Sequence, residues 1–338
     1  MDWDTLLPLV FTALMGLAML VYVVLDGYDL GVGILLRGNP DADKDRMIAS
    51  IGPFWDANET WLVLGVGLLL VAFPMAHGVI LTALYLPVAA MLIGLILRGV
   101  AFDFRVKAHA EHKPLWDAAF FGGSLLASLA QGWMLGSWIL GFRDDAVGLA
   151  FSALIALCLC AGYALLGAGW LLMKAEGALR ERAIRWAYRA LWLTGLGIAA
   201  VSLATPFASP RIFEKWFSLP NLFVLAPVPL LTFLVFATCE NALRRLGREA
   251  ALGVAGKARD WVPFAATIAL FVLAFAGLAY SVFPYLVVDR ITYLDAAAAT
   301  GSLAIMAVGA AVTLPMIAGY TVFSYKVFWG RTGELRYD

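Results

Sequence analysis

Long apolar stretches alternate with short polar connections along the whole chain. A helix needs roughly 17–25 mostly apolar residues to cross a membrane, and nine stretches reach that length. Pro87 and Pro315 lie inside two of them and are expected to kink the helices there. The pattern predicts a single polytopic membrane domain over residues 1–338, without a soluble domain. The predicted spans cover residues 6–36, 51–73, 78–97, 115–138, 147–173, 187–205, 221–243, 261–285 and 300–325.

Basic residues concentrate in every second connection and in the C-terminal tail, which together hold twenty of the 24 Lys and Arg residues. Cytoplasmic connections of membrane proteins carry such an excess. We therefore predict that these segments are cytoplasmic, that the N-terminus is outside and that, after nine spans, the C-terminus is inside. The predicted cytoplasmic set is Arg37, Lys44, Arg46, Arg98, Arg105, Lys107, Lys113, Lys174, Arg180, Arg182, Arg185, Arg189, Arg244, Arg245, Arg248, Lys257, Arg259, Lys326, Arg331 and Arg336.

The composition agrees with a membrane protein, since 62% of the residues are hydrophobic and 14% are charged, with a mean hydropathy of +0.85. The acidic Met-Asp-Trp-Asp start lacks a basic region, so we expect no cleaved secretory signal. We expect membrane lipid, and no nucleic acid, among the partners. Tryptophans lie near predicted helix ends, as is typical of interface anchors: Trp55, Trp116, Trp170, Trp186, Trp261 and Trp329 inside, and Trp3, Trp138 and Trp216 outside.

Acidic residues at membrane depth gather at the predicted cytoplasmic ends of the first four helices. Asp26 and Asp29 are three residues apart on the first helix, and Asp56 and Glu59 have the same spacing on the second. Each pair therefore lies on one helix face. Arg98, Asp103 and Arg105 end the third helix, Asp117 starts the fourth, and Glu240 lies at a similar depth on the seventh.

Two interpretations of this cluster are open. In the first, Arg98 neutralises one or two acids, and Arg98, Asp103 and Asp117 form an ion-pair network that locks the helices together. In the second, the carboxylates relay protons through a hydrated entrance from the cytoplasm, as ionisable residues do in pumps. Because acids outnumber bases, some remain uncompensated unless they are protonated or hydrated. For Asp56 with Asp26 we favour the relay.

The chain offers few groups for redox or hydrolytic chemistry. A b-type haem between membrane helices needs a His or Met ligand at membrane depth, whereas His77 is predicted at an outer helix end and His109 and His112 in a cytoplasmic loop. We therefore expect this chain to hold no metal or haem and not to be catalytic alone. The three cysteines, Cys158, Cys160 and Cys239, are expected to be small apolar residues inside helices.

Two N-terminal motifs resemble a known family. Asp26-Gly27-Tyr28-Asp29-Leu30-Gly31-Val32-Gly33 and Gly52-Pro53-Phe54-Trp55-Asp56-Ala57-Asn58-Glu59-Thr60-Trp61-Leu62 are similar to subunit II of the cytochrome bd quinol oxidases. The resemblance covers essentially the whole chain, and the short loops and length resemble the cyanide-insensitive branch. It continues with Ala72-Phe73-Pro74, Arg98-Gly-Val-Ala-Phe-Asp103-Phe-Arg105, Trp116-Asp117, Thr292-Tyr-Leu-Asp295, Leu314-Pro315 and Tyr320-Thr with Tyr325.

The resemblance implies an all-α fold of nine transmembrane helices. Two four-helix bundles and a peripheral helix are expected, with the first bundle over about residues 1–140 and the remainder over about 141–338. It also implies a heterodimer in the bacterial inner (cytoplasmic) membrane. Subunit I would hold haems b and d, oxidise quinol and reduce O₂ to water, and subunit II would be the haem-free partner. A structural quinone bound to this chain and a small single-helix subunit are further partners that the resemblance allows.

The resemblance places a proton route from the cytoplasm at the interface between the two subunits. Asp56 would accept protons, its neighbours would relay them or set the local field, and Arg98 would set the charge balance. A pure scaffold subunit without a proton role is the main alternative. A proton-coupled transporter is less favoured, because such proteins bind substrate at the midplane between repeated halves. The candidate residues are Asp56, Asp26, Asp29 and Glu59, with Trp55, Asn58, Arg98 and Asp103 in support.

Overall fold

The chain folds into long helices joined by short connections, as seen in a computed structural model that describes residues 2–253, 259–328 and 330. Among these residues eight helices are long and apolar enough to cross a membrane, and α2 with α3, bent by 49°, is a ninth if the pair is one span. The chain is therefore a multi-pass membrane protein. The long helices are α1 (Trp3–Leu35), α3 (Trp55–Ala72), α5 (Tyr85–Lys107), α6 (Lys113–Ile139), α7 (Ala146–Lys174), α8 (Gly177–Ala208), α11 (Pro227–Ala251), α12 (Val262–Val282) and α13 (Thr300–Val327).

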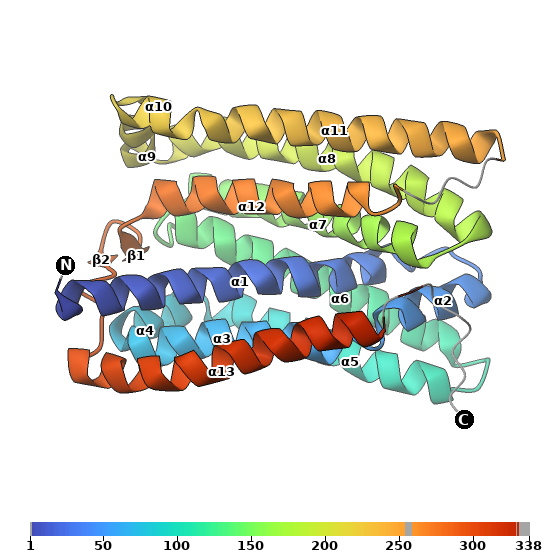
Figure 1. Cartoon of the computed structure of the whole chain (residues 1–338), viewed down its shortest axis with the longest axis horizontal. Coiled ribbons are helices and arrows are strands. Elements are labelled where there is room, and N and C mark those ends of the chain that lie inside the picture. The colour runs from blue at the N-terminus through green and yellow to red at the C-terminus, as the bar shows by residue number, and fades with distance from the viewer. Residues whose placement is uncertain (1, 254–258, 329, 331–338) are drawn as a thin grey trace.

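The long helices lie side by side along one direction (Figure 1). Helix α1 packs against α3 and α6, and α6 packs against α5. Helix α7 contacts α1 and α6 and also packs against α8 and α12. Helix α11 packs against α8 and α12. Helix α13 runs along the outside of this assembly, next to α1 and α3. It is parallel to α1, because Thr300 binds Asp4 near one end of the two helices and Tyr325 binds Tyr28 near the other.

Two predicted spans differ from the helices that form. The third, predicted over residues 78–97, is divided at Leu84 into α4 (Pro74–Ala83) and α5. Pro87 explains the break, because proline has no N–H and its ring crowds the preceding turn, so it is tolerated only in the first turn of a new helix. The sixth, predicted over residues 187–205, is the much longer α8. Its arginine-rich first turns are polar and were missed by an apolar criterion.

Two short helices were not predicted, α2 (Asp41–Ile51) and α9 (Pro210–Phe217), whereas α10 (Asn221–Leu225) is a separate helix at the start of the span predicted over residues 221–243. Helix α2 lies at the end of the bundle where α1 ends (Figure 1). Its Asp45 binds Arg105 of α5, and its Asp43 binds Arg182 of α8. These ion pairs connect α2 to α5 and to α8, so the segment before Asp56 has a fixed position.

A small hairpin, also not predicted, closes the opposite end of the bundle. Strands β1 (Tyr285–Val287) and β2 (Ile291–Thr292) pair antiparallel. The Thr292 hydroxyl donates to the Asp295 carboxylate at 2.6 Å, and the Thr292 amide donates to the same oxygen. These hydrogen bonds lower the pKa of the Asp295 carboxyl. The Ala298 amide donates to the Ala72 carbonyl at 2.8 Å, which fixes the start of α13 against α3.

The orientation of the chain in the membrane stays a prediction. Lys257, Trp329, Arg331 and Arg336, which the sequence analysis places on the cytoplasmic side, lie outside the described residues.

Glycines allow α1 to contact α7, since small residues let helix backbones approach closely. A Cβ atom on Gly31 would lie 1.8 Å from the Tyr163 carbonyl oxygen, and a Cβ on Gly167 would lie 2.4 Å from the Gly31 carbonyl carbon. On a neighbouring face, a Cβ on Gly33 would lie 2.1 Å from the Ser124 hydroxyl of α6. The backbones of α1 and α7 are therefore in direct contact beside the buried acids.

We predict that Gly31→Ala destabilises the protein by about 3 kcal/mol, the upper end of the usual cost of overpacking. The added methyl group has no space, because backbone atoms rather than a flexible side chain lie in its way. Thermal unfolding of the purified protein in detergent measures the effect. Gly67→Ala is the matched control, since a Cβ there has no neighbouring heavy atom within 4 Å. Equal midpoints for the two variants would contradict the proposed contact.

Candidate functional site

One arginine joins two helices at the centre of the acid cluster. The Arg98 guanidinium of α5 donates through Nη1 to Asp26 Oδ1 of α1 at 2.6 Å and through Nη2 to Glu59 of α3. The Arg98 and Asp26 side chains are 2% and 1% exposed, whereas Glu59 is 30% exposed. Asp26 and Glu59 are thus held in place by one shared cation.

Asp29 lies one helical turn beyond Asp26 and has a different environment. Its side chain is fully buried, and its Oδ2 accepts a hydrogen bond of 2.8 Å from Asn58 Nδ2. Its Oδ1 has no protein partner, and neither have Asp26 Oδ2 and Arg98 Nε. Arg98, Asp26 and Glu59 are close enough to act on Asp29 electrostatically. Burying a charge without a cation in contact is costly, and the contact that Asp29 makes is with an amide rather than a cation.

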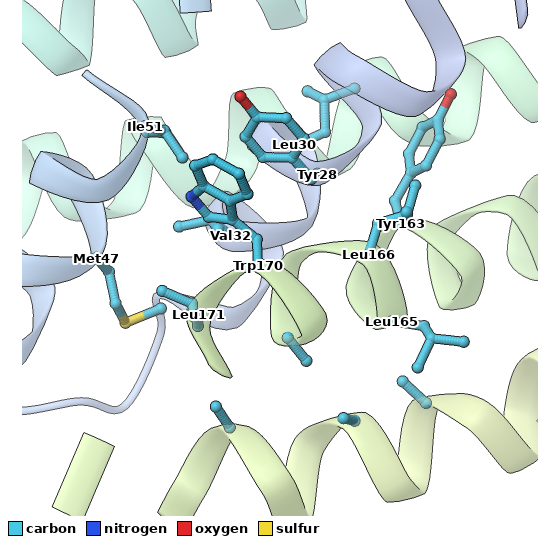
Figure 2. Close-up of a cluster of buried hydrophobic side chains, with 14 of the residues drawn as sticks. Tyr28, Leu30, Val32, Met47, Ile51, Tyr163, Leu165, Leu166, Trp170 and Leu171 are labelled. Atoms are coloured by element: carbon cyan, nitrogen blue, oxygen red, sulfur yellow. The ribbon is translucent and has the colours of Figure 1, made fainter. Parts of the chain in front are cut away.

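Aromatic rings enclose Asn58 on the side away from Arg98. Trp170 of α7 stacks on Tyr28 with ring centroids 4.3 Å apart, and Phe54 stacks on Tyr325 of α13 at 4.6 Å. Figure 2 shows Tyr28 of α1 beside Trp170, between the ribbons of the two helices. Trp170 is 1% exposed. Its assignment as a membrane-interface anchor is therefore wrong, and it is part of the core beside the site.

A line of neutral polar side chains continues from Asp26 toward α7. The Tyr163 hydroxyl donates to Gln131 Oε1 at 2.6 Å, and Gln131 Nε2 donates to the Tyr22 hydroxyl at 2.8 Å. Tyr22 precedes Asp26 by one helical turn, and the two groups interact. This line joins α7, α6 and α1, and all of its members are buried.

Two of the predicted acids do not join the buried cluster. Asp56 and Asp103 are exposed on the surface of the chain. The predicted ion-pair network is confirmed in that Arg98 pairs with two acids and joins helices, but these acids are Asp26 and Glu59. Asp103 and Asp117 are not its partners, and Asp117 instead binds Arg105 and, at 2.7 Å, Lys44.

Glu240 does not approach the cluster either. It is on α11, which lies beside α8 rather than α5, and it pairs with Arg244 of its own helix at 2.6 Å. Depth in the membrane alone was therefore a poor guide to neighbours, because residues at one depth can lie in different helix groups.

Trp55 has the expected position near the cluster. Its ring packs against Phe102 with centroids 5.4 Å apart, and it lines a small hollow together with Arg98 and Gly99. The residues that the sequence analysis missed are the neutral ones. Tyr28 and Tyr325 lie inside the motifs that carry the family resemblance. A tyrosine or amide side chain at membrane depth between apolar neighbours is a signal that could have identified Tyr28, Tyr325 and Gln131.

The site offers no grouping typical of a metal centre. Within residues 2–253, 259–328 and 330, no three His, Cys, Asp or Glu side chains lie close enough together to hold a metal ion. Cys239 is buried, and Cys158 and Cys160 are partly buried.

The chain was compared with protein families, characterised proteins and solved structures. Residues 7–328 match the family described as cytochrome bd terminal oxidase subunit II. The chain is 26% identical to cytochrome bd ubiquinol oxidase subunit 2 of Bacillus subtilis, over 93% of both chains. It is 26% identical to a probable cytochrome oxidase subunit 2 of Haemophilus influenzae, over 92% of this chain and 91% of the other. A chain of the bd oxidase structure from Geobacillus thermodenitrificans has the same fold, with a TM-score of 0.77 and 18% identity over 96% of this chain and all of that one.

We predict that Arg98→Leu destabilises the folded protein by about 3–5 kcal/mol, because removing one partner of a buried ion pair leaves an uncompensated charge. Adding Asp26→Asn to this variant should recover a large part of the loss, since the orphaned carboxylate is then neutral. Thermal unfolding in detergent of the wild type, both single variants and the double variant checks this. If the double variant is less stable than Arg98→Leu alone, Arg98 and Asp26 are not coupled as described.

Proposed function

The chain belongs to the cytochrome bd terminal oxidase subunit II family, and from this premise we propose that it is the haem-free subunit of a quinol:O₂ oxidoreductase that lines a proton-uptake route. Its second task is to stabilise the haem-bearing subunit I. The oxidase would use the protons taken up along this route when it reduces O₂ to water. The observation that carries the proposal is a series of acids whose exposure falls step by step from the surface to the core.

The series begins at Asp56, which is exposed, and continues to Glu59, which is 30% exposed and one turn further along α3. Arg98 then joins Glu59 to the buried Asp26. Asp29 follows one turn further along α1 and is fully buried. Carboxylates arranged in this way lead from a surface that water can reach to a protein interior, as relays in proton pumps do.

The charge balance of the series favours proton exchange over a purely structural role. Among the described residues, Asp26, Asp29 and Glu59 share the guanidinium of Arg98 as the cation in or near contact. A buried ion-pair network is stable only where Coulombic attraction and hydrogen bonds offset the cost of desolvation. Three acids around one arginine favour a cluster that also binds protons or water. The buried oxygens of Asp26 and Asp29 without protein partners are suitable acceptors.

The exposed face of α3 and α5 is the surface that we assign to subunit I. Asp56 and Asp103 are exposed there, among apolar side chains such as Val63 and Ile96 that are 71% and 63% exposed. A carboxylate next to lipid is unfavourable, so such residues usually face protein or a water-filled cavity. Subunit I covering this face would place the start of the acid series at the interface between the subunits.

The position of the complex in the membrane and its cofactors follow from the family resemblance, the basic residues and the histidines of this chain. The complex would lie in the bacterial inner membrane with the α2 end of this chain in the cytoplasm, because basic side chains gather there. The two groups of helices would be two four-helix bundles, with α13 as the peripheral helix. Subunit I would hold the b and d haems, since the histidines here are in α4 and in the turn before α6. A structural quinone and a small third subunit remain predictions.

We predict that Asp56→Asn lowers the rate of oxygen uptake at least about tenfold, a modest loss for a positioned proton-transfer group. The purified complex is assayed with reduced quinol, and variants are compared at equal haem content. Asp144→Asn is the control, because Asp144 is also exposed but belongs to the connection between α6 and α7 at the opposite end. This control should have wild-type turnover.

The outcomes separate the proposal from its alternative. Slow turnover with normal assembly and haem content supports a proton route through Asp56. Normal turnover would leave this subunit as a scaffold, with Arg98, Asp26 and Glu59 serving only to join helices. Loss of assembly would assign Asp56 to the contact with subunit I instead.

A further inference from the structure

Three side chains from three helices form a closed ring of hydrogen bonds next to Asp29. Asn58 Nδ2 of α3 is 2.9 Å from the Tyr28 hydroxyl of α1, which is 2.6 Å from the Tyr325 hydroxyl of α13. Tyr325 donates in turn to Asn58 Oδ1 at 3.2 Å. Asn58 and Tyr28 are fully buried, and Tyr325 is partly buried.

One assignment of donors and acceptors satisfies the whole ring. The Asn58 NH₂ group faces three acceptors, Tyr28, Asp29 and, at 3.3 Å, the Leu25 carbonyl, and the single proton of Tyr325 goes to the Asn58 carbonyl. Tyr28 then donates its proton to Tyr325, because each phenol has one proton to give. A reversed amide would place its oxygen against the Asp29 carboxylate and the Leu25 carbonyl. By donating to the Asn58 oxygen, Tyr325 supports the orientation in which Asn58 donates to Asp29.

Helix α13 makes few other contacts in this part of the protein. Leu303 and Ser324 are the residues of α13 that are buried, one near each end of the helix. At the Tyr325 end, Phe54 stacks on the Tyr325 ring. The Lys174 ammonium donates to the Phe328 carbonyl, just beyond the helix, at 3.1 Å and lies 5.4 Å from the centroid of the Phe54 ring. A largely exposed helix is therefore anchored at the one point where it reaches the buried acids.

We propose that Tyr325 is a positioning residue for proton transfer at Asp29, and that α13 acts on the acid series through the amide of Asn58. This inference rests on the proposed proton route and extends it to a helix that the acids themselves do not touch. When Tyr325 is docked, Asn58 stabilises the Asp29 carboxylate with an N–H donor. When the hydroxyl is absent, the Asn58 oxygen loses its donor and the amide is held less firmly against Asp29.

The test uses Tyr325→Phe in the complete two-subunit complex, because this change removes the hydroxyl and keeps the ring stacked on Phe54. Oxygen uptake with reduced quinol is measured over a range of pH at equal haem content. We expect turnover to fall about fivefold, the typical worth of one neutral hydrogen bond. The midpoint of the pH profile should move to higher pH by about 0.7 units, because a carboxylate that loses a donor binds its proton more tightly.

Matched variants make the test specific. Tyr320→Phe is the control on the same helix, since Tyr320 is 61% exposed and has no part in the ring; it should behave as the wild type. Tyr28→Phe opens the same ring from α1 and should reproduce the shift even if Tyr325→Phe assembles poorly. Asn58→Leu removes the amide itself, so combining it with Tyr325→Phe should slow turnover no further than Asn58→Leu alone.

Two results would overturn the inference. One is a wild-type pH profile for Tyr325→Phe in a complex where Asp29→Asn is slow, which would leave the proton route intact without a role for α13. The other is a double variant whose loss is the product of the two single losses, which would mean that Tyr325 does not act through Asn58. If Asp29→Asn itself had normal turnover, both the proton route through Asp29 and the role of Tyr325 would fail.

Discussion

The buried guanidinium of Arg98 is the group on which the arrangement of the first helices depends. In a medium of low dielectric constant, an unpaired charge is far more costly than in water, so a cation at this depth must have acids within contact distance. Asp26 of α1 and Glu59 of α3 meet that requirement. Since the three groups come from three helices, the relative heights of α1, α3 and α5 are fixed by one set of hydrogen bonds. A sliding movement of any one helix would break them.

The packing around this set explains why the acids are enclosed by protein on one side only. On the far side of α1, Gly31 and Gly167 bring the backbones of α1 and α7 into contact, and Trp170 covers Tyr28. No space remains there for water or for a flexible side chain. On the near side, Glu59 is partly exposed and Asp56 is exposed. The open side of the cluster is therefore the face of α3 and α5, and this asymmetry gives the acid series its direction.

Much of the fold could be predicted from the sequence, because the membrane allows little besides helices of sufficient length. The prediction fails where a helix is formed by polar residues. The polar first turns of α8 and the short α2 are joined by an ion pair between Arg182 and Asp43, and no pattern of apolar residues contains that information. In the site, spacing along α1 and α3 correctly grouped Asp26 with Asp29. It could not give the rotation of α3 and α5, which turns Asp56 and Asp103 outward and Glu59 toward Arg98.

The neutral residues were the least predictable part of the site, and they determine how its two acids differ. Asp26 and Asp29 share a helix face, yet one binds an arginine and the other an amide. Arg98 holds its carboxylate in place by a charge-assisted hydrogen bond, whereas an amide stabilises a carboxylate less strongly. This difference between a charged donor at Asp26 and a neutral donor at Asp29 follows from the two contacts. It also gives a physical reason for α13 to reach into the bundle with a tyrosine rather than with an apolar side chain.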